Sequence, residues 1–362
     1  MAPQVSIVVP TYKRPDLLNR CLRALMSQDF DPSAYEVIVV DDAADESTQR
    51  LVDSWAKNPQ AYLFVAERGM LHSELVPHGT AGPQEEEALL PEPYTLLEGV
   101  PRLHYLAVEQ RKGPAAARNL GWQAACGQII AFTDDDCLPS PDWLKNGAQA
   151  FEPEVAGASG RIIVPLPDQP TDYELDATGL VASTFVTANC FYRRSALEAV
   201  GGFDERFTLA WREDSELFFR LLKSGYKLVQ APQAVVVHPV RPAPWGVSLR
   251  QQRKSMFNAL IYKMHPGLYR QHLQHSPPWQ YYAILATLFT CLAGIFFGSV
   301  ALAWLAGGIW AGLTARFFIS RLRRTSRSPR HVLEMLVTSI LIPPLCVFWR
   351  LRGAFKFRVF FL

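Results

Sequence analysis

The stretch Tyr281–Leu313 constrains the fold of this chain more than any other feature, because it is almost wholly apolar and has no charged side chain. About 20 apolar residues are enough for a helix to cross a bilayer. This stretch is longer than one upright span and is interrupted at Gly298-Ser299. It predicts either a hairpin of two short spans or one long tilted helix, and the alternative is a buried helix pair in a soluble protein.

Basic residues crowd into the chain after this apolar stretch. The arginines that follow it are Arg316, Arg321, Arg323, Arg324, Arg327 and Arg330. Such a cluster is typical of a cytoplasmic loop. A further apolar segment, Val332–Trp349, is broken by Pro343-Pro344 and can either span or enter the membrane and turn back. Because the net charge is only +2 and the basic residues are concentrated here, the pattern indicates a membrane surface and not nucleic acid.

The first part of the chain alternates between strand and helix patterns. Val5–Val9 and Glu36–Val40 are short apolar runs that predict buried strands. Asp16–Gln28 has apolar residues at helical spacing, and Glu46–Ala56 can form a second helix. This order predicts an α/β fold with a parallel, Rossmann-like sheet and helices on both faces.

The alternation is interrupted by residues 66–101, which contain several prolines and glycines and the run Glu85-Glu86-Glu87, and we expect a surface insertion there. It resumes with a strand at Leu103–Val108 and a helix from Pro114 to about Cys126. The remaining candidates are strands at Gln128–Phe132, Gly160–Val164, Thr187–Tyr192, Lys227–Val229 and Ala234–Val237, and helices at Ser195–Val200 and Ser215–Ser224.

These patterns predict three parts. Residues 1–244 form the catalytic domain, residues 245–280 an amphipathic interfacial linker, and residues 281–362 the membrane-anchoring helices. The linker mixes basic and apolar side chains, which suits a helix on a bilayer surface or on the main domain. The first strand follows the N-terminus without a signal peptide, and the six cysteines form no CxxC pair, so we expect a cytosolic catalytic domain with free thiols.

Polar clusters follow three of the predicted strands, at Pro10-Thr11-Tyr12, Asp41-Asp42 and Asp134-Asp135-Asp136. Ligands of open α/β sheets bind beyond the carboxyl ends of the strands. An aromatic ring can stack on a base there, and a carboxylate can accept hydrogen bonds from a base or ribose. The acidic cluster can hold Mg²⁺ or Mn²⁺ against phosphates. The alternative for Asp41-Asp42 is turn and capping chemistry.

Several motifs in a fixed order resemble the family 2 glycosyltransferases, which have the GT-A fold. The motifs are Val5–Tyr12, Val39–Asp42, Gly113–Asn119, Thr133–Asp136, Gly201–Glu205 and Trp211–Leu217. Each is common by itself, whereas their joint order is specific. The resemblance covers about the first 240 residues and implies transfer of a sugar from a nucleotide-diphosphate donor.

The resemblance implies a donor site at the strand ends. Pro10-Thr11-Tyr12 would line the base, and Asp42 would accept a hydrogen bond from the base or ribose. Arg118 and Asn119 lie on the helix that faces the donor in the family. Arg118 can equally pair with a carboxylate without touching a ligand.

The resemblance also implies a metal site for Mn²⁺ or Mg²⁺. Asp134 and Asp136 match the two ends of the family's Asp-x-Asp motif, with Asp136 as the direct ligand and Asp134 contacting the ribose or a metal-bound water. His238 lies where many relatives carry a histidine near the diphosphate, which makes it a further candidate ligand. The alternative for His238 is a structural histidine.

Glu213-Asp214 matches the family's Glu-Asp pair, in which the aspartate is the general base of an inverting transfer. The alternative is that Asp214 only caps the helix predicted to begin at Ser215. No Gln-x-x-Arg-Trp motif follows, and the nearest stretch, Leu249–Lys254, has no tryptophan. This departure favours a single-addition enzyme over a processive synthase.

The sequence therefore predicts an inverting glycosyltransferase at the cytoplasmic face of the inner or plasma membrane. Its acceptor would be the hydroxyl or phosphate of a lipid-linked or glycan molecule. A nucleotidyltransferase is the alternative enzyme, although no glycine-rich phosphate loop with a lysine follows Val9. An inactive membrane scaffold is the other alternative, and the intact Asp134, Asp136 and Asp214 argue against it.

Overall fold

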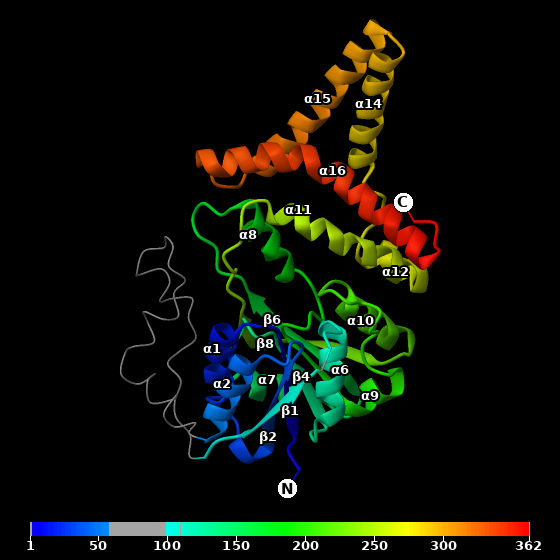
Figure 1. Cartoon of the computed structure of the whole chain (residues 1–362). Helices are drawn as coiled ribbons and strands as arrows, with labels where there is room; N and C mark the ends of the chain where they lie inside the picture. Colours follow the sequence, from blue (N-terminus) through cyan, green and yellow to red (C-terminus); the bar gives the residue numbers. More distant parts are fainter. Residues whose placement is uncertain (1, 58–98, 109, 362) are drawn as a thin grey trace. The chain divides into compact units, whose positions relative to one another are not determined.

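The computed structural model describes residues 2–57, 99–108 and 110–361, so the predicted insertion at 66–101 lies almost entirely outside it (Figure 1). The chain divides into two compact units. The first comprises Met1–Pro165 and Thr178–Val240, and the second comprises Leu166–Ala177 and Arg241–Leu362. Residues 166–177 were expected in the catalytic domain. They belong to the second unit, where Arg321 binds Asp172 through two hydrogen bonds.

An eight-stranded sheet forms the centre of the first unit, with the strand order β3-β2-β1-β4-β7-β6-β8-β5. The strands are β1 (Val5–Thr11), β2 (Tyr35–Asp41), β3 (Arg102–Ala107), β4 (Ile129–Phe132), β5 (Leu138–Pro139), β6 (Val155–Ile163), β7 (Cys190–Arg193) and β8 (Lys227–Val237). The helical segments of this unit are α1 (Pro15–Leu25), η1 (Pro32–Ala34), α2 (Glu46–Lys57), α6 (Pro114–Ala124), α7 (Trp143–Gln149), η2 (Thr178–Leu180), α9 (Arg194–Val200) and α10 (Glu213–Lys223).

The α/β fold class is confirmed, but the sheet is mixed and not wholly parallel. Strands β1 to β4 are parallel, as the alternating pattern predicts. Strand β7 is antiparallel to both β4 and β6, and β5 is antiparallel to β8. The strands of the second half do not alternate regularly with helices, so no repeated crossover requires them to run in one direction.

The two strands predicted at Lys227–Val229 and Ala234–Val237 are one strand, β8. Its pairing with β6 changes register between Ala231 and Val235, so that residues 232–234 have no partner on β6. Pro232, which has no N–H to donate, falls in this irregularity. The proline thus interrupts the sequence pattern without ending the strand.

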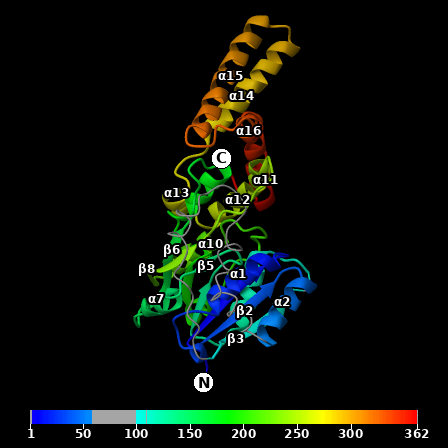
Figure 2. The same ribbon diagram turned by 90° about the vertical axis from the view of Figure 1, so that its left-hand side faces the viewer.

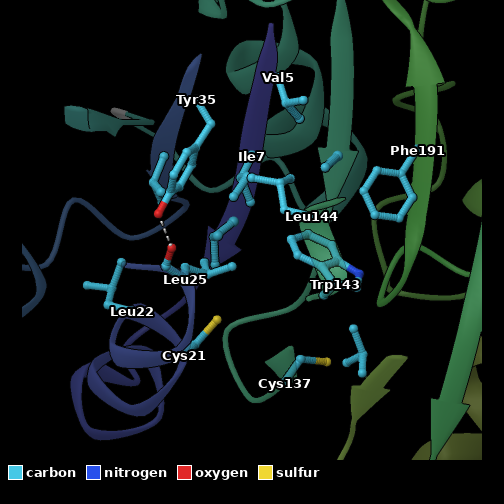
Figure 3. Packing of buried hydrophobic residues seen from close by; sticks show 14 of the residues in the cluster. Val5, Ile7, Cys21, Leu22, Leu25, Tyr35, Cys137, Trp143, Leu144 and Phe191 are labelled. Atoms are coloured by element: carbon cyan, nitrogen blue, oxygen red, sulfur yellow. Dashed lines mark hydrogen bonds between the residues drawn. The ribbon is translucent and has the colours of Figure 1, made fainter. Parts of the chain in front are cut away.

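Helices cover both faces of the sheet (Figures 1 and 2). They pack on it through two layers of buried hydrophobic residues. Successive residues of β1 alternate between them: Ile7 and Val9 belong to the layer with α1, α2 and α7, and Val8 to the layer with α6, α9 and α10. Figure 3 shows Leu22 and Trp143 in the first layer. The helices α1 and α6 are crossovers between parallel strands, so the carboxyl ends of β1 to β4 lie at one edge, where the polar clusters follow them.

The helices of the second unit are α8 (Asp172–Ala177), α11 (Val247–Gln251), η3 (Gln252–Ser255), α12 (Met256–Met264), α13 (Pro266–His272), α14 (Trp279–Phe296), α15 (Val300–Leu322) and α16 (Pro329–Phe357). Helices α14, α15 and α16 are long and apolar enough to cross a membrane. The stretch Tyr281–Leu313 is therefore two helices and not one. The chain turns at Gly298, whose φ of +72° favours glycine.

Helix α16 differs from the other two apolar helices because 39% of its most apolar window is buried within the protein, against 11% for each of them. It packs against α12, and a Cβ on Gly353 would lie 2.4 Å from the carbonyl oxygen of Met256. It also continues through Pro343-Pro344, where the sequence predicted a break. Helix α12, which belongs to the predicted amphipathic linker, therefore packs on α16 and is not an isolated surface helix.

Gly113, which precedes α6, is a position that only glycine suits. Its φ is +98°, and a Cβ there would lie 2.6 Å from the backbone oxygen of Thr208. We expect Gly113→Ala to lower the free energy of unfolding by about 1–3 kcal/mol from backbone strain, with the contact adding to this. Thermal unfolding of the full chain in detergent measures the change. Gly179→Ala, with open space around it, is the matched control and should stay within about 0.5 kcal/mol.

Candidate active site

The middle residue of the acidic cluster, Asp135, is turned into the protein. Its carboxylate accepts hydrogen bonds from Thr11 Oγ1 at 2.7 Å and Arg14 Nη1 at 2.9 Å. Burial raises the pKa of Asp135 to about 6, and Arg14 opposes this rise. Thr11, which was expected to line the base, is itself buried and positions Asp135. The structure thus reserves one aspartate of the three for holding β1 and β4 together at this edge.

Asp134 and Asp136 have different surroundings. The side chain of Asp134 is 29% exposed and accepts a hydrogen bond from Arg118 Nη2 at 2.7 Å. Burial opposes ionisation of Asp134, but the Arg118 guanidinium, with His238, outweighs it and lowers the pKa of this carboxyl. Asp136 is 7% exposed, and its Oδ1 lies 3.7 Å from His238 Nε2. The site therefore keeps Asp134 ionised beside a buried cation.

Arg118 joins the acidic cluster to the predicted catalytic pair. Its Nη1 donates to Glu213 Oε1 at 3.1 Å while its Nη2 binds Asp134, and the guanidinium is nearly fully buried. Glu213 also accepts a hydrogen bond from the backbone N–H of Trp211 at 2.7 Å. Burial, followed by the charge of Asp214, raises the pKa of Glu213 to about 7. Arg118 therefore pairs with two carboxylates, as its alternative interpretation predicted, and Glu213 of α10 is one of them.

Asp214 does not cap α10. The helix begins at Glu213, and its N-cap is Arg212, a non-glycine residue with a φ of +77°. Asp214 is half-buried and accepts hydrogen bonds from the backbone N–H and hydroxyl of Ser215 at 2.6 and 3.1 Å. The capping alternative is wrong in this structure because the helix starts earlier than predicted. Strained residues such as Arg212 concentrate at functional sites.

The side chain of Asn119, which was expected to face the donor, is held by four hydrogen bonds within the protein. Its side-chain nitrogen donates to the Phe203 carbonyl and to Glu205, at 2.9 and 3.0 Å. Its side-chain oxygen accepts from the Phe203 N–H and from Trp122, at 2.8 and 2.9 Å. With both polar atoms of its side chain engaged and only 5% exposure, Asn119 holds the loop before α10, and its contact with the donor nucleotide stays a prediction.

The predicted base-binding residues lie at the ends of β1 and β2. Asp42 accepts backbone hydrogen bonds from Lys112 at 2.9 Å and Gly113 at 3.0 Å, so it also holds the start of α6. The guanidinium of Arg111 lies 4.2 Å from the centre of the Tyr12 ring. Pro10 lies beyond the part of β1 that pairs with β4. The sequence analysis missed Arg14 and Arg111, and the signal for Arg14 is a basic residue just after a strand.

The residues that fit a divalent cation are Asp136 and His238. The ligand atoms of Asp136, Cys137 and His238 all lie within 4.8 Å of one another. His238 Nδ1 is buried and has no hydrogen-bond partner in the described part of the chain. Cys137, which the sequence analysis did not select, lies in the hydrophobic layer, and burial with the nearby Asp136 raises its thiol pKa. An oxygen and an imidazole suit Mn²⁺ or Mg²⁺ better than a protonated thiol does.

This geometry defines a class of protein: an α/β domain with an acidic, cation-compatible edge, joined to apolar helices. The model of "Glycosyl transferase family group 2" matches residues 129–351, and that of "Glycosyl transferase family 2" matches residues 6–71. The chain belongs to the family 2 glycosyltransferases and is a glycosyltransferase, as the motifs predicted.

Relatives of this chain include other glycosyltransferases. It is 25% identical over 260 residues to glycosyltransferase AglE of Haloferax volcanii, covering 69% of this chain and 71% of the relative. It is 35% identical to the pre-mycofactocin glycosyltransferase of Mycobacterium tuberculosis, over 36% of this chain and 31% of that protein. Mannosyltransferase PcManGT from Pyrobaculum calidifontis, solved with GDP-Man and Mn²⁺, has a TM-score of 0.53 at 20% identity, over 94% and 88% of the two chains. The last comparison confirms the GT-A fold.

Because the pKa of Glu213 is raised in the folded chain, the free energy of unfolding should depend on pH through this group. Between its ordinary value of 4.5 and its folded value of about 7, the folded chain binds more protons at this group than the unfolded chain. The stability that this group contributes is present below about pH 4.5 and is lost as the pH rises to about 7. We expect Glu213→Gln to flatten the fall of the melting temperature over this range.

The matched control for this measurement is Asp204→Asn. Burial opposes ionisation of Asp204, but hydrogen bonds from Arg206 lower the pKa of its carboxyl, so its stabilisation is lost as the pH falls. This control should change the acid side of the stability profile and leave the neutral side unchanged. An unaltered slope between pH 4.5 and 7 in Glu213→Gln would contradict the assignment of this carboxyl.

Proposed function

We propose that this glycosyltransferase moves a sugar, with inversion, from a nucleotide-diphosphate donor to the hydroxyl of a membrane-associated acceptor. The observation that carries the proposal is the bridge of Arg118 between Asp134 and Glu213. The bridge brings the acidic cluster within two hydrogen bonds of the residue that precedes Asp214. The donor diphosphate and the general base are therefore proposed to meet at this point.

The donor nucleotide is proposed to lie at the ends of β1 and β2. Tyr12 and the guanidinium of Arg111 present a stacked pair of flat groups, 4.2 Å apart, that suits a planar base. Pro10 and Asp42 lie at the same edge. Asp42 contributes chiefly by holding the Lys112-Gly113 backbone, next to Arg111. The neighbouring PcManGT was solved with GDP-Man, which supports a nucleotide-sugar donor without identifying the base or sugar for this chain.

Asp136 and His238 are proposed to hold a divalent cation, with Asp134 beside them. When bound, Mn²⁺ or Mg²⁺ supplies positive charge that offsets the negative charge developing on the leaving diphosphate. Arg118 supports this arrangement by keeping Asp134 ionised and fixed in direction. The presence of Mn²⁺ in the PcManGT structure supports a metal of this kind.

Asp214 is proposed to be the general base. Its half-buried carboxylate takes the proton of an acceptor hydroxyl as that oxygen attacks the anomeric carbon. One displacement of this kind inverts the configuration. A phosphate acceptor is already an oxyanion and needs no base, so a dedicated carboxylate favours a hydroxyl acceptor over a phosphate.

The apolar helices are proposed to place the enzyme at the cytoplasmic face of the membrane. The hairpin of α14 and α15 crosses the apolar layer, and the arginines from Arg316 to Arg330 stay on the cytosolic side. The burial of α16 against α12, with Arg350 bound to Gln274, favours an α16 that does not cross fully. The acceptor is then a lipid-linked or glycan molecule within reach of that surface.

Asp214→Asn tests the base. We expect it to lower transfer by about 10²–10⁴-fold, the usual contribution of a positioned base, because an amide cannot take the proton. Donor binding, measured by titration calorimetry with Mn²⁺, should stay near the wild-type value. Asp53→Asn, on the exposed face of α2, is the control and should keep full transfer. Loss of donor binding in Asp214→Asn would remove the base assignment.

Asp136→Ala tests the metal site. We expect it to weaken the Mn²⁺-dependent part of donor binding by at least about tenfold. Mutation of residues that only hydrogen-bond to metal ligands already lowers metal affinity by about that factor. Chelation of the metal should have the same effect on the unaltered protein. Asp29→Ala, an exposed partner of Lys145, is the control. If no nucleotide sugar binds with or without metal, the inactive-scaffold alternative replaces the proposal.

A further inference from the structure

The second compact unit contains a polar cavity of about 340 Å³, within the size range of small-molecule sites. Its walls come from α8 and α11, which are short, and from the apolar helices α14, α15 and α16. Tyr281 is the third residue of α14, and Arg321 lies one residue before the end of α15. The cavity therefore opens at the end of the apolar hairpin, the level at which the polar head groups of a bilayer lie.

The charges of the cavity disfavour an anion. Arg321 binds Asp172 through two hydrogen bonds, of 2.6 and 3.2 Å, so its charge is already neutralised. It also donates to the hydroxyls of Thr338 and Ser339, at 2.8 and 3.1 Å. Asp176, a second aspartate of the lining, is exposed. Asp172 and Asp176 are matched at this wall by Arg321 and by the charge of Lys254, which acts on Asp176, so no uncompensated cation is left for a phosphate.

The neutral groups of the cavity match hydroxyls and a flat apolar face. Gln251 and Gln252 line the cavity at the junction of α11 and η3. The amide nitrogen of Gln252 donates one hydrogen bond to the Ser248 carbonyl at 3.0 Å, and a primary amide has a second N–H and an accepting oxygen besides. The rings of Tyr281 and Phe317 meet edge to face, 5.3 Å apart. A cationic head group needs only acceptors and rings, whereas the paired amides add donors that a cation does not use. A sugar ring uses the acceptors, the donors and the apolar face together.

We propose that this cavity binds the sugar head group of a membrane glycolipid. Asp176 and the two glutamines hold its hydroxyls, and Tyr281 and Phe317 face the apolar side of the ring. The exposed apolar surface of α14 and α15 lies along the acyl chains. The proposal rests on the proposed function only in placing the hairpin in a membrane, and it adds a saccharide site that is separate from the donor edge.

The test uses the full chain in micelles of a polyoxyethylene detergent, which has no sugar, amine or charge. Glucosyl-diacylglycerol, phosphatidylcholine, phosphatidylethanolamine or phosphatidylglycerol is added in turn, without donor, and the melting temperature is followed. We expect the glycolipid alone to raise it in a saturable way. Free glucose at matched concentration separates a lipid source of the sugar from a soluble one and should have a weaker effect.

Variants of the lining then locate the effect. Asp176→Leu and Gln251→Ala should each raise the half-saturating glycolipid concentration about tenfold, the equivalent of one good hydrogen bond to a charged or amide group. Asp176→Asn should lose less, because an amide still accepts from a hydroxyl. Asp168→Leu, an exposed aspartate of the same segment outside the lining, is the matched control and should bind normally.

Several results would overturn the proposal. Stabilisation by phosphatidylglycerol would show an anion site, and stabilisation by the amine lipids, lost equally in Asp176→Asn and Asp176→Leu, would show a cation site. Unchanged glycolipid binding in the lining variants would place the lipid elsewhere. Donor binding and transfer are measured on the same preparations. The two proposals can therefore fail separately. Donor binding and transfer can be absent while glycolipid binding is intact, and glycolipid binding can be absent while transfer is normal.

Discussion

The site depends on the pairing of the buried Arg118 guanidinium with two carboxylates. Arg118 comes from α6 and binds Asp134 after β4 and Glu213 at the start of α10, at 2.7 and 3.1 Å. Removing one member of such a buried group leaves an uncompensated charge and typically costs about 3–5 kcal/mol. The consecutive elements α6 and β4 and the distant helix α10 therefore have one relative position in which these charges are satisfied, and this position brings Asp214 to the acidic edge.

The carboxylates at this edge have different tasks because their surroundings differ. Asp135 is buried under Thr11 and Arg14, and it holds the strand ends. Glu213 is buried against Arg118, whereas Asp134 and Asp214 keep part of their surface exposed. Adjacent acidic residues thus separate into those that hold the structure and those proposed to meet substrate. The pattern Asp-Asp-Asp does not by itself make this division.

The sequence predicted the first strands and helices of the sheet domain well, but it did not predict which distant residues and strands they contact. The alternation of β1 and β2 with helices follows from local apolar spacing, so these elements were predicted within a few residues. The hydrogen-bond partners of Asn119, Phe203 and Glu205, were not predicted because they lie more than eighty residues away. The antiparallel β7 and the membership of residues 166–177 in the second unit depend on similarly distant contacts. Local spacing carries no information about them.

The sequence by itself determined which segments are strands, which helices are apolar enough for a membrane, and, through the order of its motifs, the glycosyltransferase family. Those properties follow from side-chain periodicity and from residues adjacent in the chain. Only the tertiary structure decided that Thr11 and Asn119 position other groups, that Arg118 links the acidic cluster to α10, and that a polar cavity lies among the apolar helices. These facts depend on packing and charge pairing between distant segments, which exist only in the folded chain.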